Sequence, residues 1–104
     1  MNVETKKALI LTLLEQGTNN FYSIYQTLHE EHAIPITGAE TAVTLTFLNT
    51  SGYISIQSSP SNHRIFQIEE PGRLFLQNYR FELHKILKGF PSLAKEESFI
   101  ESSN

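Results

Sequence analysis

Several residue types and patterns that mark enzymes are missing from this 104-residue sequence. It contains no cysteine, which excludes disulfide bonds, zinc–cysteine sites and thiol nucleophiles. It also contains no aspartate, no glycine-rich phosphate loop and no Gly-x-Ser-x-Gly turn. The adjacent Glu69 and Glu70 fit the start of a helix, where negative charge is favoured, better than they fit a catalytic pair. We therefore expect no enzymatic activity, no catalytic residues and no cofactor.

Metal-binding patterns are equally sparse. His29 and His32 lie at i and i+3, but no clear third ligand accompanies them. Two ligands make an incomplete site, and histidines at the solvated end of a helix explain the spacing equally well. We expect no metal site.

Long apolar runs are absent too. The longest run, residues 8–14, is interrupted by Thr12 and is far too short to cross a bilayer. The N-terminal residues lack a small-residue cleavage site, which argues against a signal peptide. With 39% hydrophobic and 18% charged residues, the composition is that of one folded domain. We expect a cytoplasmic protein that does not contact a membrane.

Basic residues are few, which weighs against a strong nonspecific hold on nucleic acid. Eight lysines and arginines stand against eleven glutamates, and the formal net charge is −3. The segment from residue 91 on holds one lysine and three glutamates, so the first 90 residues carry only −1. The acidity is therefore partly a property of residues 91–104, which we expect to form a flexible tail.

Helical periodicity marks the first third of the chain. Apolar residues surround almost the whole of residues 4–16, which predicts a helix buried on several sides. A second helix is predicted to end near His32, and either Asn19 or Asn20 can cap its start. Its apolar residues have the spacing i, i+3, i+4 and i+7, and they are Phe21, Ile24, Tyr25 and Leu28.

A third helix, a hairpin and a fourth helix are predicted to follow. The third helix begins at Thr37 or Thr41 and ends before Gly52. Residues 53–57 and 63–68 alternate as strands do, and a Ser-Ser-Pro-Ser-Asn turn, residues 58–62, joins them. Residues 73–88 carry the last helix, which glycine and proline close. This order predicts a mostly helical α+β fold, the winged helix-turn-helix, in residues 1–90.

Three stretches resemble the PadR-like transcriptional regulators, which have this fold. "ALILTLLEQGTNNFYSIYQTLHEE" is similar to the first two helices of that family, and "FLNTSGYI" to its exit from the recognition helix. "HRIFQIEEPGRLFL" is similar to its wing and final helix, where Arg64, Phe66, Ile68 and Gly72 match residue by residue. The resemblance covers about residues 8–88 and implies a DNA-binding regulator.

The predicted recognition helix departs from the family pattern. Where the family has Gly-Thr-Leu-Tyr-Pro followed by basic residues, this chain has "AETAV", and residues 37–54 contain no lysine or arginine. Arginine readout of guanine is therefore excluded for this helix, and threonine hydroxyls and methyl groups remain. We expect weak, salt-sensitive binding to double-stranded DNA, with phosphate contacts outside the helix. The candidate DNA-binding residues are Lys6, Lys7, Thr37, Thr44, Thr46, His63 and Arg64.

The last helix, about residues 71–88, carries more apolar residues than one small domain can cover. We therefore expect the protein to be a homodimer whose interface is formed mainly by this helix. The candidate dimerisation residues are Leu74, Phe75, Tyr79, Leu83, Ile86, Leu87 and Phe90.

A second function class stays open, in which the winged helix is a protein-interaction module. Such a module would act as an antirepressor, or as a subunit that modulates another regulator, without binding DNA itself. An exposed Phe47 would favour this alternative, because it would offer an apolar contact. Clustered basic residues on one face would favour DNA.

Overall fold

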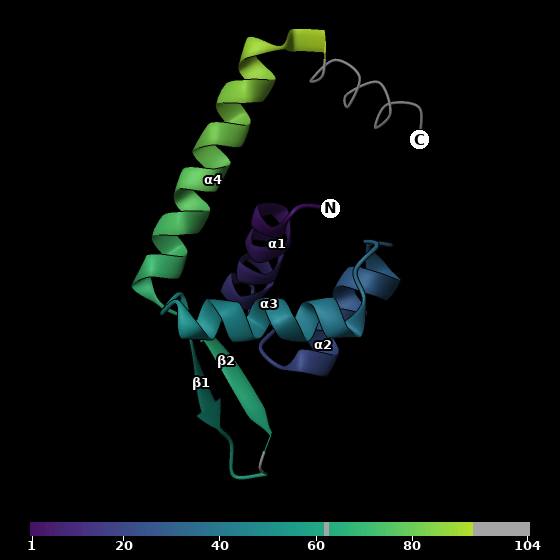
Figure 1. The fold of residues 1–104 in the computed structure, drawn as a ribbon, viewed down its shortest axis with the longest axis vertical. Helices are drawn as coiled ribbons and strands as arrows, with labels where there is room; N and C mark the ends of the chain where they lie inside the picture. Colours follow the sequence, from purple (N-terminus) through teal and green to yellow (C-terminus); the bar gives the residue numbers. More distant parts are fainter. Residues whose placement is uncertain (62, 93–104) are drawn as a thin grey trace.

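The computed structural model describes residues 1–61 and 63–92. Within these residues, the chain forms four α-helices, one short π-helix and a two-stranded antiparallel sheet (Figure 1). The elements, in chain order, are α1 (Val3–Glu15), α2 (Phe21–Gln26), η1 (Thr27–Glu31), α3 (Gly38–Thr50), β1 (Ile54–Ser58), β2 (Arg64–Ile68) and α4 (Glu70–Gly89). The protein is thus the mostly helical winged helix that the sequence predicts.

Polar side chains set the starts of the helices. The side chain of Asn20 accepts a hydrogen bond from the Ser23 amide at 2.9 Å, so Asn20, and not Asn19, caps α2. Thr37 caps α3, because its hydroxyl accepts from the Glu40 amide while the Glu40 carboxylate accepts from the Thr37 amide. This reciprocal pair is a capping box, and it satisfies two backbone donors that the helix start leaves free.

Glycines end two of the helices. Gly17 follows α1 with φ of +97°, and Gly52 follows α3 with φ of +79°. Other residues rarely adopt this left-handed conformation, whereas glycine has no Cβ to obstruct it. The sequence predicts the second helix as one element ending near His32. In the structure it is α-helical up to Gln26 and continues as the short π-helix η1 up to Glu31.

The wing is the β1–β2 hairpin. Ile54 pairs with Ile68, and Ile56 with Phe66, so these four apolar residues share one face. The amide of Phe66 also donates to the carbonyl oxygen of Asn19 at 2.8 Å. This bond joins the middle of β2 to the loop between α1 and α2.

The core surrounds α1. Ile10 and Leu11 are fully buried, and α1 contacts α3, β2 and α4. The all-round apolar pattern of this helix therefore reflects burial within one domain. The remaining core residues come from every other element and include Ile24, Leu28, Leu45, Leu48, Phe66 and Leu76.

The first half of α4 packs on this core, and the second half projects beyond it (Figure 1). Leu76 is buried, and a Cβ at Gly72 would collide with the carbonyl oxygen of Tyr53. The helix starts at Glu70, with Pro71 in its first turn, as the sequence of carboxylates and proline there predicts. The predicted tail lies outside the described residues from residue 93 on.

Candidate nucleic-acid interface

One side of α3 is buried and the other faces solvent. The buried side consists of Thr41, Thr44, Leu45 and Leu48, which pack against the core. The opposite side carries residues at i, i+4, i+7 and i+11, a spacing that keeps them in one line along the helix. This exposed stripe consists of Ala39, Val43, Thr46 and Thr50. Val43 is the most open large apolar side chain of the stripe, with 69% of its surface exposed.

Thr44 belongs to the buried side, which corrects its assignment as a DNA contact. Only 6% of its surface is exposed, and its hydroxyl donates to the Glu40 carbonyl oxygen at 2.8 Å. A threonine that bonds to the backbone four residues earlier can be buried without an unsatisfied polar atom. Its polar side chain therefore did not indicate exposure. Thr46 does lie on the exposed side, and Thr37 is exposed at the helix start with its hydroxyl used as the cap.

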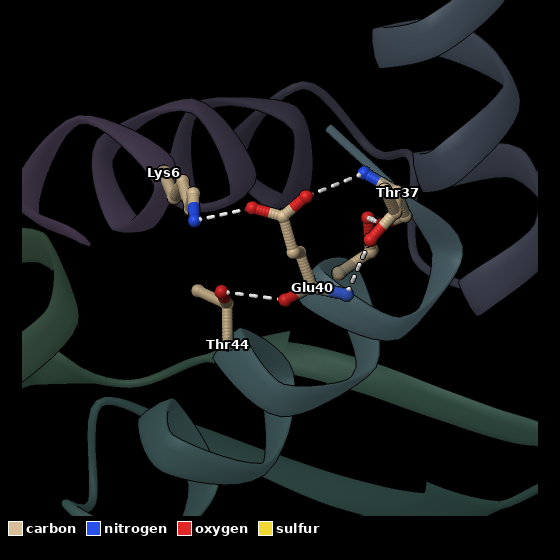
Figure 2. A network of polar contacts seen from close by, with 5 residues as sticks. Lys6, Thr37, Glu40 and Thr44 are labelled. Carbon is tan, nitrogen blue, oxygen red and sulfur yellow. Dashed lines mark hydrogen bonds and ion pairs between the residues drawn. The ribbon is translucent and has the colours of Figure 1, made fainter. Parts of the chain in front are cut away.

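Lys6 is engaged by α3. Its ammonium lies 2.6 Å from a carboxylate oxygen of Glu40, so this ion pair joins α1 to the start of α3 (Figure 2). The other carboxylate oxygen of Glu40 accepts from the Thr37 amide. These donors, Lys6 first, lower the pKa of Glu40 to about 2 from 4.5. The charge of Lys6 is therefore balanced by Glu40 within the domain.

Lys7 is buried, which corrects its assignment as a phosphate contact. Its side chain is 8% exposed, and its ammonium lies 2.7 Å from the Glu4 carboxylate. The same ammonium lies 5.1 Å from the centre of the Phe47 ring and 4.9 Å from the centre of the Phe75 ring. These are cation–π distances, so Lys7 stabilises the junction of α1, α3 and α4.

The wing supplies the exposed cation of this surface. Arg64 begins β2, and both Arg64 and His63 are exposed. They line an open cavity of about 760 Å³ that lies between the wing, α3 and the start of α2. Thr46 lines the same cavity. The structure thus brings three of the seven candidate DNA-binding residues together, namely Thr46, His63 and Arg64.

The same surface contains residues that the sequence prediction did not select. Asn19 and Tyr22, both exposed, line the cavity opposite α3, and Ala42 lines it from α3. The stripe residues Ala39 and Val43 were also missed. The helical period, anchored on the apolar Leu45 and Leu48, would have identified them, because it places them on the opposite side of the helix.

Phe47 is half-exposed, with 50% of its surface open to solvent. One side of its ring interacts with the Lys7 ammonium, so part of its role is structural. Phe47 is thus exposed in part, which is the condition that favours a protein partner. Of the candidate basic residues, Lys6 and Lys7 are engaged within the domain, and Arg64 is exposed at the wing.

The candidate dimerisation residues divide into two groups along α4. Phe75 stacks on Tyr53 at a ring distance of 5.6 Å, and the Tyr79 hydroxyl lies 3.0 Å from that of Thr5, so both serve their own domain. Beyond Tyr79 the apolar residues are more open, and Phe90 is 60% exposed. Leu74 is exposed but points to the other side of the helix by its spacing. The outer group consists of Leu83, Ile86, Leu87 and Phe90.

Residues 1–61 and 63–92 contain no group of three or more histidine, cysteine or acidic side chains that could hold a metal ion. No helix in these ranges is long and apolar enough to cross a membrane.

Comparison with known proteins identifies solved structures that share this fold. No family model and no curated protein matches the sequence. A transcriptional regulator from Clostridium thermocellum matches with a TM-score of 0.72 at 18% identity, over 83% of this chain and 89% of that one. MepR, a transcription regulator of the Staphylococcus aureus multidrug efflux pump MepA, matches with a TM-score of 0.68 at 13% identity, over 94% of this chain and 72% of its own.

A third match is the transcriptional regulator BldR from Sulfolobus solfataricus. Its TM-score is 0.53 at 14% identity, and the match covers 92% of this chain and 73% of that one. At such low identities, the likeness shows a shared fold. The fold of this chain is therefore one that known transcription regulators also have.

Proposed function

We propose that this protein is a DNA-binding transcriptional regulator of PadR-like type that acts as a homodimer and binds weakly and salt-dependently. The observation that carries the proposal is the shared surface of α3 and the wing. Thr46 of α3 and Arg64 of the wing line one cavity, and the exposed stripe of α3 bears no charge beside it. In a winged helix, the corresponding helix enters the major groove and the wing lies on the backbone.

The charge of this surface supports weak binding. Phosphate contacts from lysine and arginine dominate the affinity of proteins for DNA. Lys7 is buried and Lys6 is paired with Glu40, which leaves Arg64 as the main phosphate ligand of each wing. A dimer would supply two such arginines, so the affinity depends on assembly.

The shape of α4 supports the homodimer. Leu76 and Tyr79 start an apolar row that continues through Leu83, Ile86 and Phe90 on the same side of the helix. The domain covers the first part of this row, and the outer part extends past it (Figure 1). A second copy, related by a two-fold axis, would cover the outer part of both helices at once.

The motif at the end of the wing supports the PadR-like type. Phe66 and Ile68, which match the family pattern, are both buried, and the matching Gly72 lies against the Tyr53 carbonyl. These residues lie where β2 leads into α4. The resemblance to the PadR-like family therefore includes the residues that fix the orientation of the wing relative to α4.

The proposal is tested by measuring binding of the full chain to genomic DNA fragments while the salt concentration is varied. A dimeric protein that binds at low salt and loses affinity steeply towards physiological salt supports the proposal. A dimer that binds no fragment even at low salt contradicts it.

A second candidate function is a protein-interaction module. The observation that favours it is the exposure of Val43 and Phe47, which lie one turn apart on α3. Neighbouring exposed apolar side chains mark contact sites for other proteins. Failure to bind DNA, together with binding to another regulator that Val43→Glu abolishes, would establish this candidate instead.

A further inference from the structure

The exposed stripe of α3 has a restricted chemistry. Ala39 and Val43 have only carbon and hydrogen in their side chains, and Thr46 and Thr50 each add a methyl group beside a hydroxyl. The hydroxyl of Thr46 donates to the Ala42 carbonyl oxygen at 3.0 Å. Its hydrogen is therefore used within the helix, and the side chain offers its methyl group and acceptor lone pairs outward.

Guanine is a poor match for this stripe. In the major groove guanine presents two acceptors, O6 and N7, which require a donor from the protein. Ala39 and Val43 have no donor, and the donor of Thr46 is occupied. The hydroxyl of Thr50, at the C-terminal end of the stripe, is the one side-chain donor that remains for it. Thymine presents a methyl group at the position where cytosine has only a hydrogen atom. An apolar side chain therefore distinguishes thymine from the other bases by contact.

The electrostatics of α3 permit a close approach to DNA. Glu40 is the single charged residue of this helix, and Lys6 neutralises it across a distance of 2.6 Å. The exposed stripe is thus neutral, and Arg64 on the wing is available to hold the backbone beside it.

We infer that the exposed stripe of α3 recognises thymine methyl groups, with Val43 as the principal specificity-determining residue, so that the operator presents A·T pairs to this helix. The inference rests on the proposed DNA-binding function and names the class of base pair that α3 reads. Position along the groove comes from Arg64, and discrimination comes from the methyl contacts.

The test begins with selection of binding sequences from a randomised double-stranded DNA library by the full chain at low salt. We expect A·T pairs at the positions that face α3. Each thymine at those positions is then replaced by deoxyuridine, which removes the methyl group and keeps the base pairing. Each lost methyl contact is expected to weaken binding about fourfold, the effect of exposing one buried methyl group.

A mutant cycle ties the effect to one side chain. In Val43→Ala, the thymine-to-deoxyuridine replacement at the contacted position should change the dissociation constant by less than twofold, because the partner of the methyl group is gone. Val43→Thr, which keeps one of the two methyl groups, should give an intermediate effect. Gln67→Ala, at an exposed position of β2, is the control and should retain the full deoxyuridine effect.

The outcomes separate the inference from the function on which it rests. Selection of G·C pairs opposite α3, or deoxyuridine replacement without effect, overturns the inference while the protein remains a DNA-binding regulator. The same holds if Val43→Ala retains the full deoxyuridine effect. A library from which nothing is enriched overturns the proposed function itself.

Discussion

The ammonium of Lys7 lies 4.9 Å from the centre of the Phe75 ring, which joins the start of α1 to the first half of α4. The Phe47 ring, from α3, lies at a similar distance from the same ammonium. A lysine that is 6% exposed thus connects α3, the proposed recognition helix, with α4, the proposed dimerisation helix. Because its ammonium is buried among these rings, Lys7 contributes to the packing of the three helices.

Removing Lys7 should therefore lower stability more than it affects DNA binding. Lys7→Ala is expected to reduce the free energy of unfolding by about 1–3 kcal/mol, because the packing of the stem and the contacts with the rings are both lost. Lys7→Met keeps most of the packing and should cost less. Urea unfolding measures both. A lower salt slope of DNA binding in Lys7→Met, with unchanged stability, would show that Lys7 contacts phosphate.

The pKa of Glu40 makes the α1–α3 junction sensitive to acid. Its value of about 2 lies below the ordinary 4.5, so the ionised carboxylate stabilises the folded state above about pH 4.5. This stabilisation should be lost as the pH falls from about 4.5 towards 2. Glu40→Gln should flatten that part of the stability profile, measured by thermal unfolding. Glu31→Gln, at an exposed position, is the control, and an equal effect of both changes would contradict the prediction.

Arg64 should contribute affinity without sequence preference. Arg64→Gln is expected to weaken binding to all DNA sequences to a similar extent and to lower the salt slope by about one per lost phosphate contact. Titrations of a labelled duplex at several salt concentrations measure the slope. Gln67→Ala serves as the wing control. An unchanged slope in Arg64→Gln would show that the wing does not hold the backbone.

The outer half of α4 should control assembly without being needed for folding. Leu83→Glu combined with Leu87→Glu is expected to give a folded monomer, because these residues lie beyond the part of the helix that packs on the core. Leu74→Glu, on the other side of α4, should remain dimeric. Sedimentation and circular dichroism distinguish the two results. A wild-type protein that is a monomer at tens of micromolar, roughly the range where a stable interface should hold, would refute the homodimer.

Gly72 should not tolerate a larger residue. Gly72→Ala places a methyl group against the Tyr53 carbonyl oxygen and the Ile68 side chain, so α4 must shift. We expect a loss of about 1–3 kcal/mol of stability, as for other overpacked sites. Gly38→Ala is a suitable control, since a Cβ there meets open space. Equal stability of the two variants in urea unfolding would mean that the helix can move at no cost.

The order of the elements could be predicted from the sequence, because it depends on local properties. The change from helical to alternating periodicity identified the wing, and glycines at 17 and 52 marked the ends of α1 and α3. Caps were predicted only as alternatives, since Asn19 and Asn20 have the same chemistry. The hydrogen bond from the Ser23 amide to Asn20 decided between them.

The chemistry of the surface was decided by the tertiary structure. The sequence places Lys6 and Lys7 beside each other as free cations, yet Lys6 is balanced by Glu40, 34 positions away, and Lys7 is enclosed by rings from α3 and α4. Thr44 looks like a surface residue by its polarity, and its backbone hydrogen bond allows it to be buried. Periodicity shows which residues share a side of a helix, but only packing against distant elements determines whether that side is covered and whether a charge is neutralised.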